Sequence, residues 1–116
     1  MNHAKKECRT LLQQVVKARD VFCRKCTCAT TSGHHIYSRG DLATCFDPKY
    51  SLSLCVDCHD WAHRRPGEFE EWVIGWMGGD EYYAGLRLSN TVVKNVDFKQ
   101  IREHLRAVLL TYTERK

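Results

Sequence analysis

Apolar side chains near the start of the chain recur with a helical period. Apolar positions three or four residues apart form one side of an α-helix. We therefore expect a helix over 4–19, with lysine and arginine side chains around its apolar face. The residues that share this face are Leu11, Leu12, Val15, Val16 and Ala18.

The middle of the chain changes to patterns that are typical of strands. Residues 28–37 are rich in threonine, histidine, isoleucine and tyrosine, and residues 51–54 alternate between serine and leucine. Both patterns favour extended backbone. Turn-forming residues at 38–41 and at Asp47-Pro48 separate the two segments, so we expect two short strands joined by a loop.

Helical patterns return after the second strand. A helix is expected to begin near 55–58 and to end before Pro66, because the residue before a proline avoids helical angles. Further helices are expected over 67–78 and over 81–88, with Asp80 as a cap of the latter. The aromatic side chains in these segments are interpreted as core.

A last helix is expected after a loop over 89–96. Asp97 is its predicted N-cap, and an apolar stripe follows at helical spacing. The whole pattern predicts an α+β fold with a helix before the strands and several helices after them. The stripe of the last helix consists of Phe98, Ile101, Leu105, Val108, Leu109 and Tyr112.

Length and composition indicate one domain. The chain has 116 residues, of which 43% are hydrophobic and 28% are charged, as in soluble globular domains. No apolar run approaches the roughly 18 residues of a membrane span, and the first seven residues lack the apolar stretch of a signal peptide. We therefore expect a single domain over 1–116 in the cytoplasm, with no membrane partner. The length excludes an enzyme with separate cofactor and substrate domains.

Positive charge is concentrated at the front of the chain. The formal net charge is +4, but residues 1–28 carry seven basic and two acidic groups, a net of +5. Such a segment attracts polyanions, which makes nucleic acid a candidate partner. The alternative is a basic helix face that is only solvated.

The spacing of the cysteines points to a metal ion. Seven cysteines are present, an odd number, and a reducing compartment disfavours disulfides. Two C-x2-C pairs, Cys23/Cys26 and Cys55/Cys58, are separated by 28 residues, and two such pairs can hold one zinc ion in a tetrahedron of thiolates. Cys28 is a possible substitute ligand. Cys8 and Cys45 are interpreted as buried or free thiols.

Four histidines cluster in the same region. His59 and His63 lie four residues apart on the predicted helix and share a face, whereas Cys58 and His59 lie about 100° apart around it. One of His34 and His35 can reach the helix from the strand, and the other points the opposite way. Three imidazoles around an ion leave open positions, which is typical of a catalytic site. The alternatives are ordinary surface or core histidines, or histidines that join the zinc site.

The complete pattern resembles a known family. Cys23-x2-Cys26, Gly33-His34-His35-Ile36 and Leu54-Cys55-x2-Cys58-His59-x3-His63 are similar to the HNH endonucleases of the ββα-metal (His-Me finger) group, in particular the small zinc-knuckle type of phages and prophages. The motif covers residues 23–63. The resemblance implies a zinc-knuckle ββα-metal core over 21–66, with a helical extension over 67–116, and host-cell cytoplasm for a phage-encoded protein.

The resemblance also implies a role for each matched residue. His35 would be the general base, His34, His59 and His63 would hold the catalytic metal, and the four knuckle cysteines would hold structural zinc. The family has an asparagine that orients the base, and this chain has Tyr50 at that position. A tyrosine hydroxyl can donate a similar hydrogen bond from a longer arm, or another group takes its place.

These roles amount to metal-assisted hydrolysis of DNA. His35 would take a proton from the attacking water, and the ion, Mg²⁺, Mn²⁺, Ni²⁺ or Zn²⁺, would neutralise charge in the transition state. Arg39 is a candidate phosphate clamp, with help from Arg64 and Arg65. Backbone contacts imply little sequence specificity. The competing hypotheses are a catalytically weak or inactive zinc-binding module that binds nucleic acid, and a redox or metal-handling protein.

Overall fold

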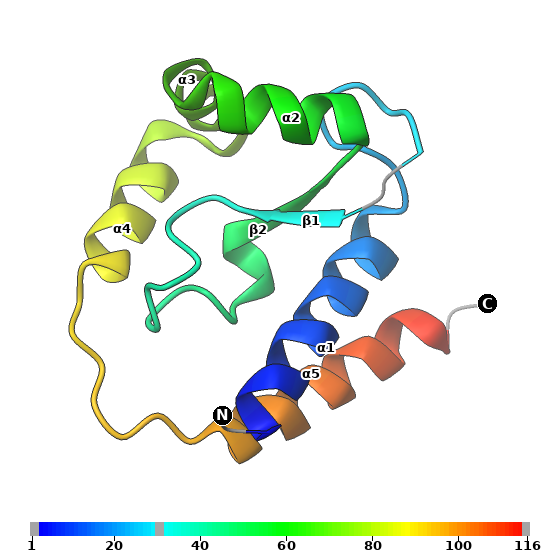
Figure 1. Ribbon diagram of the computed structural model, residues 1–116, viewed down its shortest axis with the longest axis vertical. Coiled ribbons are helices and arrows are strands. Elements are labelled where there is room, and N and C mark those ends of the chain that lie inside the picture. The colour runs from blue at the N-terminus through cyan, green and yellow to red at the C-terminus, as the bar shows by residue number, and fades with distance from the viewer. Residues whose placement is uncertain (1–2, 30–31, 115–116) are drawn as a thin grey trace.

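The chain folds into five α-helices and one two-stranded antiparallel sheet in the computed structural model, which describes residues 3–29 and 32–114. This arrangement confirms the expected α+β class (Figure 1). The elements are, in order, α1 (His3–Asp20), β1 (Ser32–His35), the 3-10 helix η1 (Pro48–Tyr50), β2 (Ser51–Leu54), α2 (Val56–Arg64), α3 (Pro66–Met77), α4 (Gly79–Ser89) and α5 (Phe98–Thr113).

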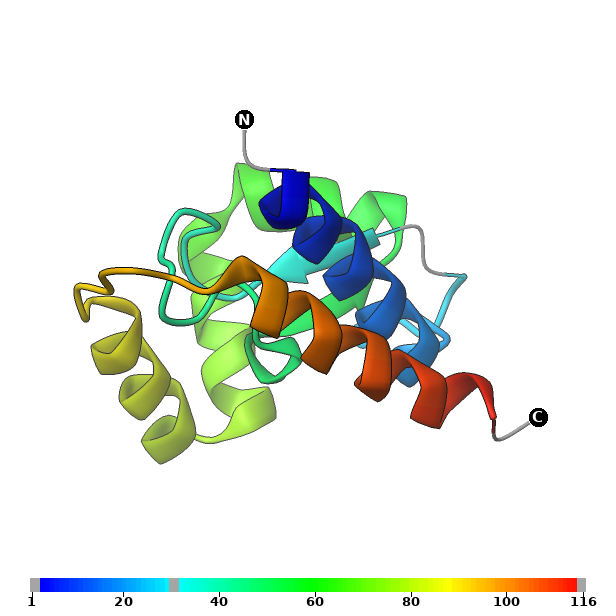
Figure 2. The ribbon, with the colours of Figure 1, turned by 90° about the horizontal axis from the view of Figure 1, so that it is seen from below.

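Two apolar clusters support the fold. One lies between α1, α5 and the loop before η1, where Leu12, Val15 and Leu105 are fully buried. The other joins the sheet to α2, α3 and α4 around Leu52, Leu54 and Val73. Figure 2 shows α5 lying along α1, and in Figure 1 α5 lies at the opposite end of the molecule from α3.

The helix at the end of the chain follows its sequence pattern closely. Asp97 caps α5 by accepting a hydrogen bond from the backbone N–H of Gln100 (3.1 Å), and the predicted apolar stripe packs against the α1 cluster. The carboxylate of Glu7 on α1 also bonds Arg102 and Arg106 of α5, each at 3.0 Å. The long connection over 90–97 therefore leads to a well-anchored helix.

The strand expected over 28–37 is present but shorter, because residues 28–29 and 36–37 are not part of it. β1 begins at Ser32, and residues 30–31 lie outside the described chain. The preceding residues instead form a tight hairpin, the knuckle 22–29, in which the N–H of Cys23 bonds the carbonyl of Cys28 (2.8 Å) and the N–H of Thr27 bonds the carbonyl of Cys23 (2.9 Å). Thr27 has a positive φ of 65°, which a tight turn of this kind requires.

The register of the sheet separates its two histidines. His34 pairs with Leu52, and His35 pairs with Ser51. Successive side chains of a strand point to opposite faces, so the His34 side chain faces α2 and the His35 side chain faces α1.

Helix α1 crosses the face of the sheet opposite to α2, and hydrogen bonds join it to both strands. The buried carboxylate of Asp20 accepts a hydrogen bond from the N–H of Ser53 in β2 (2.8 Å). At the edge of β1, the side-chain amide of Gln13 accepts from the N–H of Gly33 (2.7 Å) and donates to its carbonyl (3.3 Å). A Cβ at position 33 would lie 3.2 Å from the Gln13 side-chain oxygen, so this close approach favours glycine.

The aromatic residues of α3 and α4 supply core as expected, although two of them stay exposed. Phe69 and Tyr82 are buried, whereas Trp76 and Tyr83 are 38% and 48% exposed. Tyr37 donates a hydrogen bond to the carbonyl of Tyr82 (2.6 Å). Among the residues that the structure describes, no helix is long and apolar enough to cross a membrane.

Candidate metal centres

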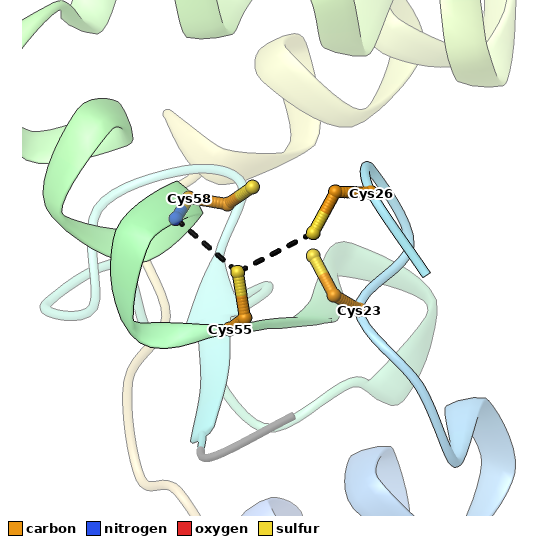
Figure 3. A group of neighbouring side chains, drawn as sticks. All are labelled: Cys23, Cys26, Cys55 and Cys58. Atoms are coloured by element: carbon orange, nitrogen blue, oxygen red, sulfur yellow. Dashed lines mark hydrogen bonds between the residues drawn. The ribbon is translucent and has the colours of Figure 1, made fainter. Parts of the chain in front are cut away.

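Four cysteines from two segments converge on one point. Cys23 and Cys26 come from the knuckle, and Cys55 and Cys58 come from the N-cap and first turn of α2 (Figure 3). All four sulfur atoms lie within 4.8 Å of one another. Neighbouring sulfurs around a tetrahedral zinc ion are about 3.8 Å apart, so these residues could bind one zinc ion.

Hydrogen bonds around the sulfurs favour thiolates. The Sγ atom of Cys55 accepts from the N–H of Cys58 (3.4 Å) and lies 3.4 Å from the Sγ atom of Cys26. Burial alone would raise the pKa of the Cys23 thiol, but backbone N–H groups of Cys26, Cys55 and Lys25 lower it to about 6. A thiolate is the form that binds metal.

The Cys58 thiol needs a nearby cation to become a thiolate as well. Burial first, then hydrogen bonds to Cys55, Cys26 and Cys23, and last the negative charge of Cys23 raise the pKa of Cys58. A divalent ion reverses this preference and releases the protons. The cluster therefore fits a zinc ion in its donor set as well as in its geometry.

The other three cysteines stay apart from this cluster. Cys28 is exposed, and the structure does not bring it to the four sulfurs, so the interpretation of Cys28 as a substitute ligand gains no support. Cys8 and Cys45 are buried free thiols, as expected. Burial raises the pKa of both, and the Sγ atom of Cys8 donates a weak hydrogen bond to the carbonyl of Phe98 (3.2 Å).

Three histidines, two from α2 and one from β1, form a second cluster next to the cysteines. Ring nitrogens of His34, His59 and His63 lie within 4.8 Å of one another, and the ring centroids are 4.7 to 5.0 Å apart. His59 and His63 share one face of the helix, and His34 reaches them from β1. One divalent ion bound by all three rings would keep further coordination positions open.

The environment of His34 keeps its ring neutral. Its side chain packs edge-on against Phe69 at 4.8 Å between centroids. Burial first, and then the positive charges that His59, His63 and His35 would carry, lower the pKa of His34 to about 4. Burial also lowers the pKa of His59. Neutral imidazoles are the form that a metal ion requires.

His35 is held by a backbone group and not by a side chain. Its Nε2 atom lies 3.0 Å from the carbonyl oxygen of Cys45. A carbonyl only accepts hydrogen bonds, so Nε2 carries the proton of the neutral ring and Nδ1 keeps a free lone pair. Burial lowers the pKa of His35; the carbonyl of Cys45 raises it, and the charges of Arg39 and Arg9 lower it.

A cavity of about 540 Å³ joins these groups at the free edge of β1. The three clustered histidines and His35 line it, together with Gln13, Arg39 and Phe69. Arg39 lies in the turn after β1 and is exposed. Arg64 and Arg65 do not line this cavity; Arg64 pairs with Asp60 (2.7 Å) and Arg65 with Glu68 (3.9 Å).

The structure does not bring Tyr50 to His35. Ile36 donates its N–H to the carbonyl of Tyr50 (2.9 Å), which continues the register by one pair and places the Tyr50 side chain on the His34 face of the sheet. Its ring is buried and packs against Tyr37 at 5.5 Å between centroids. The orienting hydrogen bond expected from position 50 comes instead from Cys45.

Sequence reasoning missed two contributors to this site. The carbonyl of Cys45 has no signature in the sequence, because every residue has one. Gln13 belongs to the cavity wall through its hydrogen bonds to Gly33, and only its place one turn before the apolar residues that face the sheet could have suggested it. Cys45 contributes its backbone carbonyl, and Gln13 contributes a side-chain amide that bonds the backbone of Gly33.

Comparison of the chain with protein-family models, curated proteins and solved structures finds no match. The case for a function therefore depends on the residues and contacts described above.

Proposed function

We propose that the protein is a metal-dependent endonuclease of the HNH, or ββα-metal, type that hydrolyses phosphodiester bonds of DNA. One observation carries the proposal. Three imidazoles converge at the free edge of β1, while the adjacent His35 borders the same cavity with a lone pair available at Nδ1. A metal-ligand set beside a candidate base is the combination that hydrolysis of a phosphodiester requires.

In this proposal the two clusters bind two different metal ions. The four cysteines hold a structural zinc ion, since a closed set of four thiolates keeps solvent away from the ion. His34, His59 and His63 hold a second divalent ion, and three imidazoles suit zinc or nickel better than magnesium. When bound there, this ion supplies positive charge for the phosphoryl oxygens of the substrate.

His35 acts as the general base. Its Nδ1 atom takes a proton from a water molecule, whose oxygen attacks phosphorus as the bond to the 3′ oxygen breaks. The products are a 5′ phosphate and a 3′ oxygen that is protonated from solvent. The hydrogen bond to the carbonyl of Cys45 fixes the tautomer and the ring orientation, and it stabilises the imidazolium that forms. Arg39 at the cavity rim contacts the phosphate.

A cleavage assay tests the proposal. The purified protein is incubated with plasmid DNA and with branched DNA in the presence of Mg²⁺, Mn²⁺, Ni²⁺ or Zn²⁺. We expect cleavage with at least one ion, and a loss of about 100-fold or more in His35→Ala. His104→Ala, an exposed histidine on α5, is the matched control and should cleave normally. Wild-type protein that binds DNA but cuts no substrate with any ion would contradict the nuclease proposal and favour a non-catalytic zinc-binding module.

A further inference from the structure

Most arginines of the protein are already paired with carboxylates. Among the nine arginines in the described part of the chain, six lie within 4.0 Å of a carboxylate oxygen: Arg19, Arg24, Arg64, Arg65, Arg102 and Arg106. Within these residues, only Arg9, Arg39 and Arg87 have no such partner. A guanidinium without an anion beside it is free to bind one from a ligand.

The path of α1 brings Arg9 to the candidate site. The helix contacts β2 through Asp20 and the free edge of β1 through Gln13. Arg9 is one turn before Gln13 and lies on nearly the same face of the helix. It therefore lies beyond the free edge of β1, one turn away from Gln13, which lines the cavity.

The electrostatics agree with this placement. The charge of Arg9 is close enough to Cys45 to oppose the rise that burial causes in the pKa of the Cys45 thiol, and the carbonyl of Cys45 bonds His35 (3.0 Å). Arg39 lines the cavity directly. The side chain of Arg9 is partly buried, so its guanidinium is less free to move than one on an open surface.

We propose that Arg9 and Arg39 form a two-guanidinium subsite that binds a phosphate of the DNA backbone next to the bond that is cut. The inference rests on the proposed function and adds a residue from α1, outside the strands and helix that carry the histidines. Guanidinium groups match phosphate oxygens with paired hydrogen bonds. The subsite reads backbone and not base edges, so it should bind DNA of any sequence.

Equilibrium binding of DNA tests this inference independently of cleavage. All variants are made in a His35→Ala background, and their affinity for a short fluorescent DNA duplex is measured by anisotropy over a series of salt concentrations. We expect Arg9→Ala and Arg39→Ala each to weaken binding roughly tenfold. Each should also lower the slope of log affinity against log salt by about one, as expected when one phosphate contact is lost. The effects should be equal for duplexes of unrelated sequence.

Arg87→Ala is the matched control, because Arg87 lies on α4 and is the third arginine without a carboxylate partner. It should bind DNA with unchanged affinity and slope. Unchanged binding by Arg9→Ala, at a melting temperature equal to that of its parent, would overturn the inference. So would an equal loss in all three variants, which would show only a diffuse charge effect. If the wild type never cuts DNA but Arg9→Ala still loses affinity and slope selectively, the nuclease proposal fails and the phosphate subsite stands.

Discussion

The sulfur cluster and the imidazole cluster are neighbours on one nine-residue helix, yet they differ in ligand number and in access to solvent. The sulfur cluster has four donors from the knuckle and the start of α2, and two of its residues, Cys23 and Cys55, are buried. The imidazole cluster has three donors and borders a cavity, with His63 exposed. Closed sets of four ligands hold structure, and open sets of three leave room for a substrate. The adjacent residues Cys58 and His59 serve different clusters because a step of one residue turns a helix by about 100°.

The largest effect should follow from opening the sulfur cluster. Cys26→Ser removes one of four donors, and we expect it to lower the free energy of unfolding by about 3 kcal/mol or more. Thermal unfolding and elemental analysis measure the stability and the zinc content. Cys28→Ser is the matched control, since Cys28 is equally exposed, two residues away and outside the cluster. If both variants keep zinc and stability, the four cysteines hold no structural ion.

An intermediate effect should follow from opening the imidazole cluster. His59→Ala removes one of three donors from a partly exposed position, so we expect the free energy of unfolding to change by about 1 kcal/mol or less. Affinity for the second, exchangeable ion, measured by titration calorimetry, should fall by about 100-fold or more, with cleavage lost in parallel. If His59→Ala still binds both ions with wild-type affinity, the imidazole cluster is not the site of the exchangeable ion.

The smallest effect should come from Tyr50. Tyr50→Phe deletes the hydroxyl that the family resemblance assigns to orienting the base, but the ring lies on the His34 face of the sheet and packs on Tyr37. We expect the cleavage rate to stay within about twofold of the wild-type rate in single-turnover assays. A loss as large as that of His35→Ala would mean that the hydroxyl reaches the base during the reaction.

The elements with strong periodicity were predictable. The helices expected over 4–19 and 67–78 match α1 and α3 to within one residue at each end, and the cap at Asp97 is confirmed. Local sequence fixes such features, because helical spacing and capping operate within a few residues. The spacing of the C-x2-C pairs likewise predicted that four cysteines would meet, as they do.

The features that failed depend on contacts between distant residues. The strand expected over 28–37 begins later than predicted, because hydrogen bonds within the knuckle take up residues 28 and 29. Tyr50 was one candidate for orienting the base because of its position in a motif, and only the register of the sheet shows that it lies on the other face from His35. The anchor of His35 is a carbonyl ten residues along the chain, which no side-chain pattern encodes.

The carboxylate of Asp20 has a consequence for how the sulfur cluster assembles. It bonds the N–H of Ser53 in β2 and forms ion pairs with Arg19 and with Arg24. Arg24 stands between the two knuckle cysteines, and β2 leads directly into Cys55. One acidic side chain thus ties both halves of the ligand set to the same helix end through bonds of the protein itself. The chain is pre-organised, so capturing the metal should cost less conformational entropy than gathering four cysteines from a disordered polypeptide.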